Sequence, residues 1–127
     1  MNETGTKFID REANEPEIAE NVLFGGIIDC KHKVVIEKDV FTGHDVKLLT
    51  GSHDYTKFGI ERRHFVTGGP ITIREGVWIA SYAIILGPCE IGKHSVVGAG
   101  SVVTTEKIPE YQLWGGNPAR FIKEIPH

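Results

Sequence analysis

Apolar residues recur along this chain at every sixth position. Counting by six from Ile18, and again from Ile73, gives twelve positions, of which eleven are apolar. About five would be expected by chance in a chain that is 40% apolar. The first array consists of Ile18, Phe24, Cys30, Ile36, Thr42 and Leu48, with Thr42 as the exception. The second array consists of Ile73, Ile79, Ile85, Ile91, Val97 and Val103.

A second series lies four residues after each member of the first and contains mostly small or β-branched residues. Its members are Val22, Ile28, Val34, Val40, Val46, Ser52, Val77, Ala83, Cys89, Ser95, Ser101 and Lys107, where the pattern ends. A six-residue period does not match the 3.6-residue repeat of an amphipathic helix. It is typical of a parallel β-solenoid with three short strands per coil, in which large apolar side chains point to the axis and smaller ones fit the corners. The sequence therefore predicts an all-β, three-sided solenoid.

The two arrays also predict how a single domain over residues 1–127 is organised. Twelve hexads at three per coil give about four coils, at 18–53 and 73–108, followed by a C-terminal tail at 109–127. The second array is out of phase with the first, because Ile73 lies one position beyond a whole number of hexads from Ile18. This slip places an inserted loop at 54–72, which we expect to project from a corner with His53 at its base.

Composition supports strands and narrows the functional classes. Ile and Val together number 26 against 5 Leu, a bias that excludes an all-helical fold. The net charge is −3 and the basic residues are scattered, so the sequence does not predict the basic patch that nucleic-acid binding requires. No apolar run approaches the ~18 residues of a membrane-spanning helix. The polar start of the chain does not resemble a signal peptide, so a cytoplasmic protein without membrane contacts is expected. Cys30 and Cys89 have neither zinc-site nor disulfide-framework spacing, and no metal is expected.

Four short motifs resemble those of a known family. They are Thr50-Gly51-Ser52-His53-Asp54-Tyr55-Thr56, Gly76-Val77-Trp78-Ile79-Ala80-Ser81, Gly98-Ala99-Gly100-Ser101-Val102-Val103 and Gly115-Gly116-Asn117-Pro118-Ala119-Arg120. Together with the hexads they are similar to the hexapeptide-repeat acyltransferases, in particular sugar O-acetyltransferases of the colanic-acid, maltose and galactoside type, over about residues 18–125. The resemblance implies a left-handed parallel β-helix, whereas the general rule for β crossovers would favour the right hand.

The resemblance also implies a reaction. It predicts an acetyl-CoA-dependent O-acetyltransferase acting on a hydroxyl of a sugar or glycan precursor, as in polysaccharide biosynthesis, with His53 as the general base. An unperturbed histidine titrates near pH 6.5 and can accept a proton at neutral pH. The group that orients His53 is open between Asp54, a backbone carbonyl and a more distant carboxylate. A loop histidine that only caps a turn is the structural alternative.

Further residues are assigned to acetyl-CoA. The resemblance places Trp78, Ser81, Ala99, Thr104, Arg120 and Lys123 along the cofactor, with the last two near its phosphates. Small residues at four positions would let a pantetheine arm approach the backbone, although taken singly they also suit solenoid corners; they are Ala80, Gly98, Ala99 and Gly100.

Several residues have weaker or open assignments. Thr105 stands where relatives often carry lysine, which leaves one phosphate contact unassigned. Trp114 could stack on adenine or pack under the tail. Three histidines at outward hexad positions and one in the loop are expected to be solvated; they are His32, His44, His94 and His64.

The acceptor and the assembly follow from the resemblance as well. Only two coils precede His53, and Met1–Glu17 shows no apolar period. Typical sugar O-acetyltransferases place a helical segment and additional coils ahead of the histidine and build part of the acceptor pocket from them. The resemblance therefore implies either an open site for a large acceptor or a pocket completed by a neighbouring subunit. Family members are trimers with sites between prism faces, which predicts a homotrimer acting on a small-molecule or glycan acceptor.

Two other functions are compatible with the sequence. An N-acetyltransferase acting on an amino sugar or another amine would use the same fold and base. A structural β-helix protein without catalysis belongs to a different class. The carbonic-anhydrase branch of the fold would need three zinc histidines, and the pair His53 and His64 lacks a third partner at the expected place.

Overall fold

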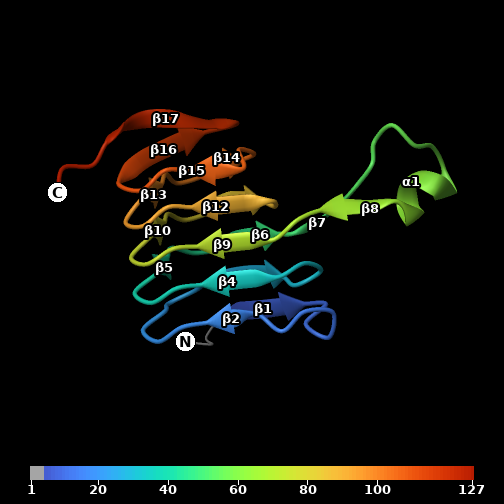
Figure 1. Cartoon of the computed structure of the whole chain (residues 1–127), viewed down its shortest axis with the longest axis horizontal. Coiled ribbons are helices and arrows are strands. Elements are labelled where there is room, and N and C mark those ends of the chain that lie inside the picture. Colours follow the sequence, from blue (N-terminus) through green and yellow to red (C-terminus); the bar gives the residue numbers. More distant parts are fainter. Residues whose placement is uncertain (1–4) are drawn as a thin grey trace.

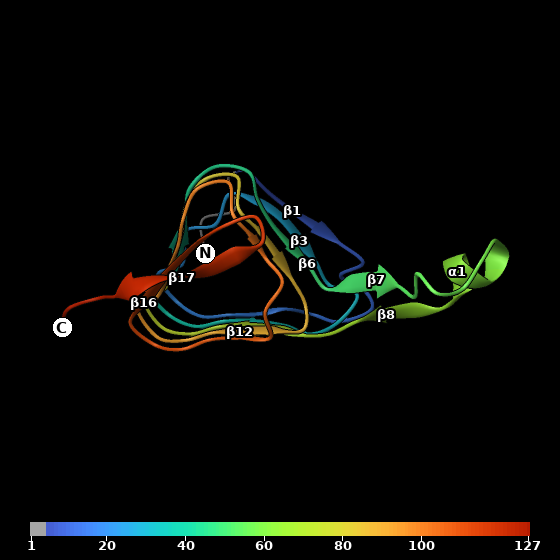
Figure 2. The same ribbon diagram turned by 90° about the horizontal axis from the view of Figure 1, so that it is seen from above.

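The computed structural model describes residues 5–127, which wind into a prism with three faces (Figures 1 and 2). The first face contains, in spatial order, β1 (Thr6–Ile9), β3 (Gly26–Asp29), β6 (Val46–Leu49), β11 (Ile84–Leu86) and β14 (Val102–Val103). The second contains β2 (Glu17–Ile18), β4 (Val34–Ile36), β9 (Ile71–Ile73), β12 (Cys89–Ile91) and β15 (Lys107–Ile108). The third contains β5 (Phe41–Thr42), β10 (Trp78–Ile79), β13 (Val96–Val97), β16 (Gln112–Gly116) and β17 (Ala119–Glu124). Strand pairs on all three faces are parallel, except that β17 folds back antiparallel on β16.

The coils stack as the six-residue period predicts. In the second array, strands one coil apart are separated by three hexads, so that Thr72 opposes Glu90 and Trp78 opposes Val96. Four complete coils are flanked by a partial turn at each end, formed by β1 and by β15 with β16 (Figure 1). The prediction of an all-β, three-sided solenoid is confirmed.

Both six-residue series face the interior. All six large residues of the second array are buried, and only Ile18 and Thr42 of the first array are half-buried. The series of smaller residues is also buried, apart from Ser52 and Lys107. Burial of each Ile or Val side chain contributes about 1.5–3 kcal/mol relative to exposure. The core is therefore one continuous column along the prism axis, and it holds the three faces together.

The first array slips by two positions on the first face. Three hexads after Ile28 would be Val46, but the residue that lies opposite Ile28 is Leu48, two positions further along the chain. The reason is that the corner at Gly25–Gly26 is short. Gly26 adopts a φ of +139°, and a Cβ there would collide with the carbonyl oxygen of Val46. The next corner, at residues 30–33, is correspondingly longer. Because a slip of two positions preserves the inward–outward alternation of a strand, both series stay buried despite it.

The stack begins earlier than the period indicates. β1 lies beside β3, and Phe8 packs against the core opposite Ile28, again two positions beyond a spacing of three hexads. This spacing is not a multiple of six, so the hexad count does not detect β1.

The inserted segment is a projecting arm whose bounds differ from the expected 54–72. It leaves the corner between the first and second faces as β7 (Gly51–His53) and returns through α1 (Ile60–His64) and β8 (Val66–Gly68), which pairs antiparallel with β7 (Figure 2). Thr72 lies within β9 and belongs to the coil. The hairpin closes at its base because Gly69 N–H donates to the Thr50 carbonyl at 3.0 Å. Among the described residues 5–127, no helix has the length and hydropathy needed to span a membrane.

Candidate functional site

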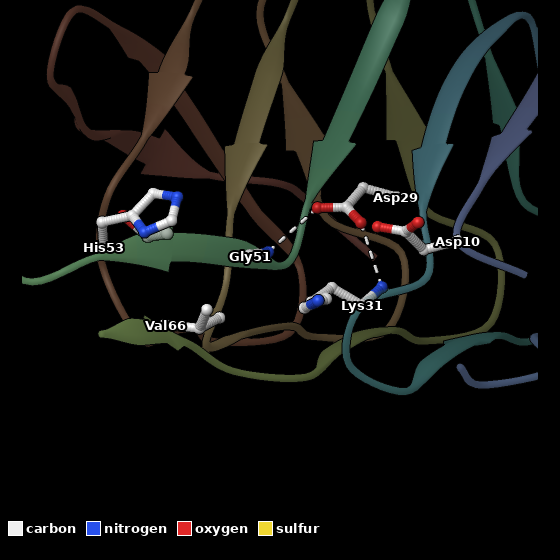
Figure 3. Close-up of a pocket in the computed structure, with 7 residues that line it drawn as sticks. Asp10, Asp29, Lys31, Gly51, His53 and Val66 are labelled. Atoms are coloured by element: carbon white, nitrogen blue, oxygen red, sulfur yellow. Dashed lines mark hydrogen bonds between the residues drawn. The ribbon is translucent and has the colours of Figure 1, made fainter. Parts of the chain in front are cut away.

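His53 is the last residue of β7, at the root of the arm, and its side chain is exposed. A pocket of about 260 Å³ opens beside it (Figure 3). The lining residues come from the ends of β1 and β3, the long corner after β3, and the two strands of the arm; they are Asp10, Asp29, Lys31, Gly51, Ser52, His53 and Val66. The lining combines two carboxylates, an ammonium group and an imidazole.

Asp29 anchors the outgoing strand of the arm. Its Oδ2 accepts a hydrogen bond from Gly51 N–H at 2.9 Å, and its Oδ1 accepts one from Lys31 N–H at 3.0 Å (Figure 3). Both contacts go to backbone groups, so the carboxylate fixes the direction in which β7 leaves the coil. Each oxygen keeps a second lone pair for a ligand in the pocket.

Asp54 has a different role from that of an orienting partner. Its Oδ1 accepts hydrogen bonds from the Thr56 hydroxyl at 2.6 Å and from Thr56 N–H at 2.9 Å, and these bonds hold the pKa of the Asp54 carboxyl below its usual range. The carboxylate therefore closes the first turn of the arm. Within residues 5–127 the structure gives the His53 ring no hydrogen bond, so the group that orients it stays open.

A groove of about 450 Å³ lies on the other side of β7. It shares Gly51 and Ser52 with the His53 pocket, and it contains Thr104, a residue assigned to the cofactor from the sequence. The remaining lining residues are Leu49, Leu86, Gly87, Pro88 and Glu106. Since Leu49, Leu86 and Pro88 supply apolar surface, one strand separates a polar pocket from a partly apolar groove.

The other predicted cofactor residues gather elsewhere on the prism. Trp78 lies on the third face, 43% exposed, and stacks on Phe41 with ring centroids 5.9 Å apart. Ala80 and Ser81 follow it at the corner toward the first face. Gly98 and Ala99 occupy the same corner one coil further along, where Gly100 N–H donates to the Ser81 carbonyl at 2.9 Å.

Arg120 and Lys123 are exposed residues of β17, on the edge of the same third face. The structure thus divides the nine predicted site residues into two groups. His53 and Thr104 lie at the arm corner, and the other seven lie on the third face and its corner with the first.

Packing describes the surroundings of Trp114 and of the two cysteines. Trp114 is half-buried against the core, and its Nε1–H donates to Gln112 Oε1 at 2.9 Å, so it packs under the tail. Burial raises the pKa of the Cys30 thiol and raises that of Cys89 to about 12. Both thiols are protonated core groups at neutral pH and do not serve as nucleophiles.

Two of the histidines expected to be solvated are half-buried and also make contacts within the chain. His32 Nε2 lies 3.1 Å from the Thr67 carbonyl oxygen in β8, and His94 tilts against the Tyr111 ring at 5.3 Å. His44 and His64 are exposed, as expected. His32, Asp10, Asp29 and Lys31 were missed as site residues because the hexad pattern carries no signal for them. They lie at the site because the slip on the first face lengthens the corner after β3 and because β1 adds a strand beside β3.

Comparisons with known proteins agree with this architecture. The family model described as bacterial transferase hexapeptide (six repeats) matches residues 70–105. The galactoside O-acetyltransferase of Escherichia coli K12 is 43% identical over 84 residues, covering 66% of this chain and 36% of that protein. The crystal structure of a maltose O-acetyltransferase from Clostridium difficile 630 has a TM-score of 0.82 at 29% identity, over 95% of this chain and 65% of that one. A hexapeptide-repeat acetyltransferase of Vibrio cholerae, complexed with acetyl-CoA, shares the fold with a TM-score of 0.82 at 24% identity, over 97% and 72% of the two chains.

The three-faced column of hexads and these neighbours define the class, which is the left-handed parallel β-helix proteins. Within that class, residues 70–105 match the bacterial transferase hexapeptide model, and the relatives named above are acetyltransferases, the kind of protein that the motifs predict. The chain spans between 28% and 64% of the length of the curated relatives it matches.

Proposed function

We propose that this protein transfers an acetyl group from acetyl-CoA to a hydroxyl of a sugar or glycan precursor. The observation that carries this proposal is the position of His53, at the end of a strand that separates a polar pocket from a partly apolar groove. A base at this position lines the pocket proposed for the acceptor, and its neighbour Ser52 lines both that pocket and the groove proposed for the thioester. The O-acetyltransferases of galactosides and maltose among its relatives support the same chemistry.

His53 acts as the general base of a direct transfer. Its ring nitrogen takes the proton of the acceptor hydroxyl as the oxygen attacks the thioester carbonyl. The tetrahedral intermediate collapses by breaking the carbon–sulfur bond, and the imidazolium returns its proton to the departing thiolate. Proton transfer by a positioned histidine contributes about 10²- to 10⁴-fold to the rate.

The pocket suits a polyhydroxy acceptor. Asp10 and Asp29 supply oxygens that accept hydrogen bonds from hydroxyl groups, and Lys31 supplies an ammonium donor. Apolar contact is limited to Val66. An acceptor with adjacent hydroxyls fits this mixture of donors and acceptors better than an apolar one.

Within one copy of the chain, the residues proposed to bind acetyl-CoA lie at two different corners of the prism. The groove with Thr104 offers apolar surface for the pantetheine arm, and Ser52, the residue before His53, lines it. Trp78, Ser81, Ala99, Arg120 and Lys123 lie around a different corner of the prism, where Arg120 and Lys123 can pair with phosphates. A homotrimer that places the arm corner of one copy against the third face of its neighbour unites the two groups. The same fold accommodates acetyl-CoA in the Vibrio cholerae neighbour, which is consistent with this donor.

Replacement of His53 by Ala tests the proposed base. Thiol release from acetyl-CoA with the best acceptor should fall by ~10² to 10⁴, while acetyl-CoA affinity and oligomeric mass stay unchanged, because only the proton acceptor is lost. His64→Ala serves as control, since that exposed histidine lies on α1 away from the pocket. Undiminished thiol release in His53→Ala would overturn the assignment.

A panel of acceptors distinguishes the alternatives. Simple sugars, amino sugars and nucleotide sugars should be compared at fixed acetyl-CoA concentration, with product linkage determined by mass spectrometry and NMR. Turnover of hydroxyl acceptors supports the proposal, whereas acetylation confined to amines assigns the protein to the N-acetyltransferases. Absence of acetyl-CoA binding would favour a structural protein.

A further inference from the structure

The arm that carries His53 is held by contacts at its root. No residue between Gly51 and Gly68 is buried, so the core that stabilises the coils does not reach the arm. β7 and β8 pair with each other, with Ser52 opposite Thr67 and His53 opposite Val66. The direction of this hairpin, and with it the position of the His53 ring, therefore depends on hydrogen bonds to the adjoining coil.

The returning strand is fastened by His32. The His32 Nε2 atom lies 3.1 Å from the Thr67 carbonyl oxygen. Since a carbonyl oxygen only accepts, Nε2 carries the hydrogen in this contact. Thr67 is the cross-strand partner of Ser52, the residue before His53, so the contact lies one residue from the proposed base.

His32 is itself held in place. Its backbone N–H donates to Thr50 Oγ at 2.9 Å, and the Thr50 hydroxyl donates to the Asp29 carbonyl at 3.0 Å. Thr50 is fully buried, and its own carbonyl accepts from Gly69 N–H at 3.0 Å. His32 reaches the arm because it lies in the corner that is lengthened by the slip at Gly25–Gly26.

The two strands of the hairpin are thus fixed from the same coil. Asp29 Oδ2 holds Gly51 N–H of the outgoing strand, and His32 holds the Thr67 carbonyl of the returning strand. Two attachment points on different strands prevent rotation of the hairpin about its root, which one point would allow.

We propose that His32 is a positioning residue, which holds the returning strand of the arm so that His53 stays aligned between the pocket and the groove. The inference rests on the proposed function of His53. Loss of the His32 contact leaves the core, the cofactor residues of the third face and the His53 side chain intact. It removes alignment, and misplacement of a catalytic group by about 1 Å can cost on the order of 10²-fold in rate.

Two substitutions of His32 distinguish the contribution of its hydrogen-bond donor from that of its side-chain volume. His32→Leu removes the hydrogen-bond donor at similar size, and His32→Gln retains an N–H at the place of Nε2. The expected result for His32→Leu is a loss of about 10- to 100-fold in kcat, with an unchanged KM for acetyl-CoA, and His32→Gln should recover most of the rate. His127→Leu is the matched control, because that histidine lies at the C-terminal end, at a corner away from the arm (Figure 2).

Amide hydrogen exchange provides a readout that does not need turnover. The Asp54 N–H donates to the Phe65 carbonyl across the arm at 3.2 Å, and the Ala80 N–H donates to the Val97 carbonyl in the coils at 2.9 Å. In His32→Leu the Asp54 amide should exchange faster while the Ala80 amide keeps its protection.

Four outcomes would overturn the proposal: an unchanged kcat in His32→Leu, equal losses in His32→Leu and His32→Gln, parallel loss of protection at Ala80, or unchanged exchange at Asp54. The exchange result tests His32 without relying on turnover, whereas undiminished turnover in His53→Ala would refute the base assignment.

Discussion

Ser95 and Ser101 occupy corner positions that most other coils fill with Val, Ile, Ala or Cys. Both are fully buried, and each hydroxyl contacts the backbone of the C-terminal segment. Ser95 Oγ donates to the Pro109 carbonyl at 2.6 Å and accepts from Gln112 N–H at 3.0 Å, and Ser101 Oγ accepts from Gly116 N–H at 3.1 Å. Gln112 and Gly116 are the first and last residues of β16, so the two serines fix both ends of the last parallel strand.

Substitution of these serines should destabilise the fold unequally. Ser95→Ala leaves two backbone groups without a partner and should lower the free energy of unfolding by about 1–3 kcal/mol. Ser101→Ala removes one contact and should cost less. Urea unfolding followed by circular dichroism measures both, and equal or negligible losses would contradict this account.

At the scale of elements, the second face carries a ladder of charges that links successive coils. Arg74 Nη1 lies 2.9 Å from Glu37 Oε2, and Arg74 Nε lies 2.8 Å from Glu90 Oε2. Lys107 Nζ approaches the other oxygen of Glu90 at 3.8 Å. The ladder follows β4, β9, β12 and β15, and it pairs neighbouring strands through side chains that face solvent.

The ladder makes stability depend on pH. The hydrogen bond from Arg74 holds the pKa of Glu90 below its usual range. A carboxyl with a lowered folded pKa stabilises the fold above its unfolded pKa, about 4.3, and loses that contribution as the pH falls through the folded value. Since the two side chains are 42% and 35% exposed, the effect is at most about 1 kcal/mol.

We therefore expect the urea midpoint of wild type to exceed that of Glu90→Gln at pH 7. The difference should vanish once the pH has fallen through the lowered pKa of Glu90. Glu110→Gln, at an exposed position near this ladder, provides the control. A difference that persists at low pH would show that the ladder acts through packing instead of charge.

At the scale of the whole molecule, the third face leaves apolar side chains open to solvent. Leu23, Phe41 and Trp78 are 53%, 45% and 43% exposed, and they follow one another up the face in register. A contiguous apolar patch of this kind marks an interaction surface. The division of the predicted site residues between two corners is consistent with the homotrimer proposed above.

A homotrimer of the 14.0 kDa chain should have a mass of about 42 kDa, three times that of the chain, by light scattering. Mixed assemblies of His53→Ala and Ala99→Trp, each inactive alone, should regain about a quarter of wild-type activity if every site takes His53 from one copy and Ala99 from its neighbour. Failure to recover activity in mixed assemblies would place each site within a single copy.

Local periodicity made much of this fold predictable. A coil of three hexads brings residues at a fixed sequence separation into contact, so the burial of Ile79, Ile85 and Ile91 could be inferred from their spacing. The position of His53 at the root of an insertion followed from the phase slip between the arrays. Phe8 and β1 could not be inferred in this way, because their separation from β3 is not a multiple of six.

The sequence by itself determined the solenoid and the buried series, because both depend on regularly spaced residues. It also indicated His53 as the candidate base, through short motifs that resemble those of a known family. Only the tertiary structure decided the bounds of the arm, the pocket of Asp10, Asp29 and Lys31, and the contact between His32 and Thr67. The physical reason is that these features join coils across a corner whose length is set by Gly25–Gly26. A shift of two positions at a corner leaves the hydrophobic pattern intact and still alters which outward side chains meet.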